Sequence, residues 1–117
     1  MWRLLTGMGY SFSSIGFNHL LKDLSDHYHL YAMVLMEMDD VENAAASLKK
    51  AIYLSPGHLM ANYMLGNIEQ RQGRQPQARK LFRQVAKMLD HMEDDELVPG
   101  SEGMTAGRMR QLVKLYL

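Results

Sequence analysis

The sequence contains no cysteine and no excess of charge of either sign. Without cysteine, disulfide bonds and thiol chemistry are excluded, which fits a reducing compartment. Thirteen Lys and Arg residues balance thirteen Asp and Glu residues, so the net charge gives no reason to expect nucleic acid or an anionic membrane as the main partner. Long apolar runs are missing near the start, where Leu4-Leu5 is too short for a signal sequence or a membrane span. We therefore expect a soluble, cytoplasmic protein without membrane insertion.

The sequence instead repeats a pattern of residue types at a constant offset of 34 residues. Four apolar positions recur in register, with Ala44, Leu48, Ala51 and Leu54 corresponding to Ala78, Phe82, Val85 and Met88. Upstream in each unit a small residue, Ala32 or Gly66, lies at the middle of an expected helix, and Asp39 or Gly73 lies where a turn is expected. This offset matches the period of tetratricopeptide (TPR) repeats, in which small residues let two paired helices approach closely.

This period predicts an all-α solenoid of two TPR hairpins. The 117 residues, 47% of them hydrophobic, suffice for one modest domain. We expect the units at residues 25–58 and 59–92, each with a leading helix, a turn and a second helix. Pro56 should break the chain between the units, and Pro76 suits the first turn of the last repeat helix.

The segment before the repeats, residues 1–24, does not fit a third unit. The glycines and serines of residues 1–14 predict a loop, and apolar residues favour a short helix over residues 15–24. We expect Asp26 to cap a separate leading helix of the first repeat. The short helix is the only candidate to cover the front of the array, because two repeats leave apolar faces at both ends.

The segment after the repeats offers a cap for the other end. Residues 93–104 predict an acidic and Gly-rich linker, in which the run Glu93–Glu96 lacks the spacing of a calcium loop and is expected to be solvated. Thr105 can then N-cap a helix over residues 105–117 with apolar residues at helical spacing. We expect this helix to pack on the second repeat.

The tail also carries a narrower resemblance. Val98–Met109 reads VPGSEGMTAGRM and resembles the stretch that follows the TPR repeats in long chemotaxis receptor methyltransferases of the CheR type. The resemblance implies a non-catalytic accessory module that accompanies an S-adenosylmethionine-binding catalytic domain, for which this chain leaves no room. Its partner would then be a chemoreceptor or another signalling protein. The sequence leaves open whether the chain is part of a larger methyltransferase, and residues 1–24 match nothing in that family.

Two alternatives to that function remain. The first is a free-standing TPR adaptor with an unrelated peptide partner, and the second is a small enzyme or metal protein that uses the histidines. The second is weakly supported, because His27 would point away from the helix face that Asp26 and His29 share. Gly7 and Gly9 follow no apolar strand, so a nucleotide loop is not indicated. We expect neither a catalytic site nor a cofactor.

The resemblance to TPR domains also implies a peptide-binding groove, which lies on the leading helices. When the groove positions of the family are carried over one by one, the groove of this sequence consists of His29, Met33, Met36, Glu37, Met60, Tyr63, Asn67, Gln70 and Arg71. Thioethers and a tyrosine beside amide and guanidinium groups suit an extended or helical peptide. Only Asn67 matches the clamp by which chaperone-binding TPR domains hold a C-terminal carboxylate, so that ligand is disfavoured.

A basic stripe on the last repeat helix is a second possible docking surface. Arg79, Arg83 and Lys87 recur at every fourth position and therefore share one helix face. The simpler interpretation is a solvated outer face that pairs with the acidic linker. Exposed repeat ends could also stack between copies, so we expect a monomer or a weak homo-oligomer.

Overall fold

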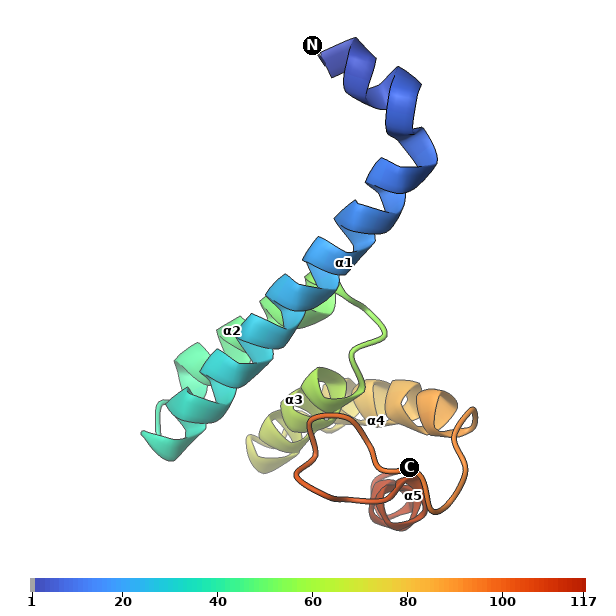
Figure 1. The fold of residues 1–117 in the computed structure, drawn as a ribbon. Helices are drawn as coiled ribbons and strands as arrows, with labels where there is room; N and C mark the ends of the chain where they lie inside the picture. Colours follow the sequence, from blue (N-terminus) through green and yellow to red (C-terminus); the bar gives the residue numbers. More distant parts are fainter. Residues whose placement is uncertain (1) are drawn as a thin grey trace.

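The computed structural model of the protein describes the backbone of residues 2–117 and the side chains of residues 16–117. Its helices form two antiparallel pairs, α1 with α2 and α3 with α4, and α5 packs on α4 (Figure 1). Their bounds are α1 Trp2–Glu37, α2 Val41–Leu54, α3 Leu59–Arg71, α4 Gln75–Leu89 and α5 Ala106–Lys114. The prediction of an all-α array of helical hairpins is confirmed. No helix of the described residues is long and apolar enough to cross a membrane.

Helix α1 differs from the sequence-based expectation. A single helix of 36 residues replaces the loop, the short helix and the separate leading helix, so the predictions for residues 2–24 and for an N-cap at Asp26 were wrong. Met1 lies outside the described residues. No proline precedes Pro56, and each glycine costs a helix only about 1 kcal/mol relative to alanine, so nothing in this segment is a strong helix breaker. The N-terminal half of α1 projects beyond the other helices (Figure 1).

The turn between α1 and α2 is a Schellman motif. Asp39 has a positive φ of 62°, and the Asp40 N–H donates to the Leu35 carbonyl at 2.8 Å. The Asp39 N–H donates to the Met36 carbonyl at 3.0 Å, which satisfies a second carbonyl that the helix end leaves free. Asp40 then caps α2, because its Oδ1 accepts from the Asn43 N–H at 3.3 Å.

The turn between α3 and α4 repeats the same motif one repeat period later. Gly73 has a φ of 76°, the Arg74 N–H donates to the Glu69 carbonyl at 2.9 Å, and the Gly73 N–H donates to the Gln70 carbonyl at 3.2 Å. The predicted left-handed glycine at this helix end is confirmed, as is Pro76 in the first turn of α4. The backbone therefore follows the same period as the sequence.

The first hairpin is held by small buried residues and by hydrogen bonds between its helices. Ala32 of α1 and Ala44 of α2 are completely buried in one core cluster. The Ser25 hydroxyl donates to the Ala51 carbonyl at 2.7 Å, and the Ser47 hydroxyl donates to the Tyr28 carbonyl at 2.7 Å. Small side chains thus bring the helices close, and the hydroxyl groups find backbone partners across the contact.

The two helices of the second hairpin pack closely through a different pair of residues. Ala32 and Leu48 of the first unit correspond to Gly66 and Phe82 of the second. A Cβ atom on Gly66 would lie 2.9 Å from Cε1 of Phe82, so the larger ring is accommodated by the smaller partner. Phe82 also stacks on Tyr116 after α5, with ring centroids 4.7 Å apart. The tail is therefore packed into the core of the second hairpin, and the prediction of a C-terminal cap is confirmed.

One buried charge distinguishes the second unit from the first. Leu35 corresponds to Glu69, which is only 5% exposed. Arg74 compensates for this carboxylate, since its Nε donates to Oε2 at 2.7 Å and its Nη2 donates to Oε1 at 2.9 Å. The hydrogen bonds from Arg74 hold the pKa of Glu69 below its usual value despite the burial.

The packing of Gly66 against Phe82 leads to a prediction for stability. Gly66→Ala should destabilise the protein, because overpacking costs about 1–3 kcal/mol and exceeds the helix propensity of about 1 kcal/mol that alanine adds. Introducing Phe82→Leu as well restores the residue pair of the first unit and should relieve the clash. A double-mutant cycle of denaturant unfolding measures this coupling. Additive effects of the two substitutions would contradict the steric account.

The ion pair leads to a second prediction. Glu69→Leu copies the first unit and should leave the midpoint of thermal unfolding unchanged or raise it, because the burial cost of the carboxylate disappears. Arg74→Gln should lower the midpoint, because it leaves the buried carboxylate without its cation. Circular dichroism melts at neutral pH compare the two variants. A lower midpoint for Glu69→Leu than for the wild type would contradict this prediction, because the carboxylate and its ion pair would then stabilise the fold.

Candidate functional site

The predicted groove residues lie on α1 and α3, but their accessibility differs. His29 is buried, whereas Glu37 and Arg71 are exposed. The half-buried members are Met33, Met36, Met60, Tyr63, Asn67 and Gln70. Two of these also serve the core, since Met36 packs against the first cluster and Tyr63 packs against the second. The predicted residues are therefore not one uniformly open surface.

The tail loop closes one end of this face. The segment between α4 and α5 passes back over α3 (Figure 1). At Gly100, where φ is 79°, a Cβ atom would lie 3.3 Å from Cε1 of His29 and 3.6 Å from Cγ of Met60. A side chain at position 100 would thus be both conformationally strained and crowded. The loop separates the covered residues His29 and Met60 from the rest of the predicted groove.

The tail motif supplies the hydrogen bonds that shape this loop. The Ser101 hydroxyl donates to the Val98 carbonyl at 2.6 Å and accepts from the Met104 N–H at 3.0 Å. The Val98 N–H donates to the Met104 carbonyl at 2.9 Å, so both ends of the loop are joined. Thr105 caps α5 by accepting from the Arg108 N–H at 3.2 Å, as predicted. Serine and threonine of the motif therefore have structural roles.

Arg110 fastens the same tail to the end of α4. Its guanidinium donates to the carbonyl oxygens of Leu89 and Met92 and to the carboxylate of Asp94. The Gly107 N–H donates to the Asp94 carbonyl at 3.0 Å. The predicted linker is thus a tightly bonded connection, and Asp94 pairs with Arg110 of the tail.

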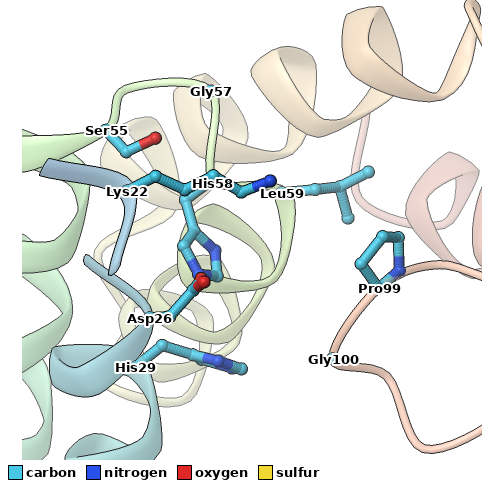
Figure 2. Close-up of a pocket in the computed structure, with 9 residues that line it drawn as sticks. All are labelled: Lys22, Asp26, His29, Ser55, Gly57, His58, Leu59, Pro99 and Gly100. Carbon is cyan, nitrogen blue, oxygen red and sulfur yellow. The ribbon is translucent and has the colours of Figure 1, made fainter. Parts of the chain in front are cut away.

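A cavity of about 450 Å³ lies between α1, the start of α3 and the tail loop (Figure 2). Its polar lining includes Lys22, Asp26, His29 and His58, and Pro99 of the tail borders it on the opposite side. Sequence reasoning considered Asp26 and His29 but missed His58, because no periodic pattern links the α2–α3 connection to the middle of α1. Only the folded arrangement brings these groups together.

The hydrogen bonds of His58 define its tautomer. Its Nδ1 accepts from the Ala61 N–H at 3.2 Å and thereby caps α3, so Nδ1 carries no proton. Nε2 must then carry the proton of the neutral ring and donates to Oδ1 of Asp26 at 2.9 Å. Asp26, predicted as an N-cap of its own helix, instead links α1 to the start of α3.

His29 is the least satisfied group of the cavity. Its Nε2 is buried without a hydrogen-bond partner, and its ring centroid lies 4.9 Å from that of His58. Burial lowers the pKa of His29, and His58 adds to this effect, whereas Asp26 opposes it. Burial of the ring therefore favours its neutral form. Within the described residues, no group of three or more His, Cys, Asp or Glu side chains is arranged to hold a metal ion.

The basic stripe lies on the outer side of the second hairpin. Arg79, Arg83 and Lys87 are exposed on α4. Among the side chains described for residues 16–117, none of the three forms an ion pair, so they do not pair with the acidic linker. Their role as a docking surface stays a prediction.

The burial of His29 predicts a pH dependence of stability. Its folded-state pKa lies below the ordinary value of 6.5, so the unfolded chain takes up the proton first. The free energy of unfolding should therefore fall as the pH drops below about 6.5. His29→Gln should reduce this slope, and the exposed His27→Gln on the same helix is the matched control. Equal slopes for both variants in urea titrations between pH 7.5 and 5 would refute the assignment.

Comparison with known proteins supports the assignment of the first hairpin as a repeat. A family model described as tetratricopeptide repeat matches residues 26–58, which include most of the paired region of α1 and all of α2. A comparison with curated proteins found no match. TPR repeats are modules of protein–protein interaction and are not themselves catalytic. Residues 26–58 are thus a TPR repeat, and the second hairpin repeats its turn geometry.

Proposed function

We propose that the protein is a protein-binding module that holds an extended peptide on the open part of the α1–α3 face. The observation that carries this proposal is the division of that face by the tail loop. Gly100 packs over His29 and Met60, whereas Met33, Glu37 and Arg71 lie outside these contacts. The peptide site would consist of Met33, Glu37, Asn67, Gln70 and Arg71, with accessible side chains on both helices.

The chemistry of this open part suggests the kind of peptide. Met33 offers adaptable apolar contact, and Asn67 and Gln70 can bond to a peptide backbone. Arg71 is exposed and can pair with an acidic group of the ligand, while Glu37 on the opposite helix can pair with a basic group. A peptide with both charges and an apolar side chain between them fits this arrangement.

In its more specific form, the proposal makes the chain an accessory module of a CheR-type chemotaxis receptor methyltransferase. Support comes from the resemblance of Val98–Met109 to the tail of that family. The module would bind a chemoreceptor or another signalling partner in the cytoplasm and would itself be non-catalytic. The partner would direct the attached enzyme or regulate it.

A free-standing adaptor with an unrelated peptide partner is the second candidate, because the tail motif also has roles within the fold. Ser101 and Thr105 of the motif make hydrogen bonds within the cap, and Ala106 is completely buried. Any TPR array closed by such a cap could use these residues, whatever its partner. The motif alone therefore does not require a methyltransferase.

Binding to peptides tests the site and the partner separately. We expect a displayed library of random peptides to yield ligands for the wild-type chain, and Arg71→Ala should weaken their binding about tenfold or more without changing the unfolding midpoint. Arg108→Ala on α5 is the matched control, because the exposed side chain of Arg108 belongs to neither predicted docking surface; it should bind like the wild type. Tyr63→Ala is unsuitable as a probe, because Tyr63 contacts Phe82 with ring centroids 6.1 Å apart.

The results distinguish the two functions. If Arg71→Ala and Arg108→Ala bind selected peptides equally well, the groove assignment is wrong. If the groove binds peptides but not the cytoplasmic segments of chemoreceptors, the adaptor is favoured over the methyltransferase module.

A further inference from the structure

A second groove, of about 500 Å³, lies where the two hairpins meet. Residues of α2, α3 and α4 line it, and α3 forms its floor because α3 packs against both other helices. The floor residues are Asn62, Leu65 and Glu69. At about 100° per residue, they are turned by roughly half a turn from Met60 and Asn67 of the α1–α3 face. The second groove and the α1–α3 face therefore lie on opposite sides of α3.

The middle of the second groove is apolar. Leu65 at the floor is only 5% exposed. Ile52 of α2 and Leu81 of α4 also line the groove, and both are half-buried against the first core cluster. Since these side chains are fixed by the packing between the hairpins, the groove offers an apolar seat for one large side chain of a ligand.

The polar residues of the floor are held in place by neighbouring groups. Asn62 donates through Nδ2 to the carbonyls of Pro56 and His58, at 3.2 Å and 2.8 Å. Glu69 is held by its two hydrogen bonds from Arg74. The floor is therefore ordered before any ligand binds, which lowers the entropy cost of binding.

The charge of the second groove is positive at its rim. Lys49 of α2 and Lys80 of α4 approach it from the two sides of the floor, and both are exposed. Neither forms an ion pair with a side chain described for residues 16–117. The carboxylate of Glu69 is already neutralised by Arg74. A ligand in the groove would thus meet two cations that no acid balances, and carboxylates of the ligand would complement them.

The positive charge extends along α4 beyond the groove. All charged residues of this helix are basic and exposed, namely Arg79, Lys80, Arg83 and Lys87. This length favours a segment of polypeptide with several acids over a small anion. A nucleic acid fits less well, because the chain has no net positive charge and the middle of the groove is apolar.

We propose that the second groove binds an acidic segment of a partner protein that carries one large apolar side chain. This side chain would lie between Ile52 and Leu81, and neighbouring carboxylates would pair with Lys49 and Lys80. The site is independent of the proposed function, because it lies on the other side of α3.

A displayed peptide library tests the site. Each peptide carries one Leu, Phe or Trp at its centre and only Asp, Glu, Ser and Gly around it. We expect the wild-type chain to select acid-rich peptides, whose labelled forms bind saturably in fluorescence polarisation. Replacing the central residue by alanine, or the acids by their amides, should each raise the dissociation constant about tenfold or more.

Two charge reversals on α4 locate the bound peptide. Lys80→Glu should raise the dissociation constant about tenfold or more, because it places an acid beside the acids of the peptide. Arg79→Glu is the matched control, since it makes the same change at an exposed residue of α4 that does not line the groove. Its effect should stay below about threefold. Thermal unfolding should confirm that both variants fold like the wild type.

Three results would overturn the proposal. The first is that no selected peptide binds the wild type below several hundred micromolar. The second is equal weakening by Lys80→Glu and Arg79→Glu, which would indicate a diffuse attraction to α4. The third is displacement of the peptide by a single-stranded oligonucleotide, which would make a nucleic acid the ligand.

One further variant separates this proposal from the peptide site on the α1–α3 face. Arg71→Ala should bind the acidic peptides like the wild type, because Arg71 does not line the second groove. Lys80→Glu should likewise leave binding to the α1–α3 face unchanged. Loss of the acidic peptides in Arg71→Ala would assign them to the α1–α3 face and overturn the second groove as their site.

Discussion

The ring of Phe82 is the contact on which the second half of the molecule depends. It lies so close to Gly66 that any Cβ atom there would clash, and it stacks on Tyr116 of the tail. One side chain therefore joins α3, α4 and the cap. Since the cap in turn brings Gly100 over His29 and Met60, the same contact indirectly decides which part of the leading-helix face is open.

The two ends of the array differ for a physical reason. At the C-terminal end, α5 buries Met109 and Val113, and Arg110 donates to the carbonyl of Leu89 at the end of α4 and to that of Met92 beyond it. At the other end, α1 leaves Tyr31 and Val34 exposed. The array is therefore closed at its C-terminal end, whereas apolar side chains of α1 stay accessible at the other end.

Much of the repeat geometry could be predicted from the sequence, because it depends on local signals. The repeat period located the turns at Asp39 and Gly73. Capping and helix-breaking residues located the ends of α2 and the cap at Thr105. The continuous α1 could not be predicted in this way, because glycine and serine have weak helix propensities but do not end a helix by themselves. The burial of His29 and its proximity to His58 were also missed, since both depend on contacts between distant segments. The second unit has Glu69 where the first has Leu35, and the sequence alone gives no reason for this difference. The structure supplies the reason, because Arg74 pairs with Glu69.

The tail is an integral part of the fold and not a mobile linker. Hydrogen–deuterium exchange of the full chain at neutral pH tests this. The amides of Val98 and Ala106, which donate to the carbonyls of Met104 and Glu96, should exchange as slowly as those in the middle of α4. Rapid exchange at Val98 and Ala106 while α4 stays protected would contradict the claim, because the cap would then open without the hairpin that it closes.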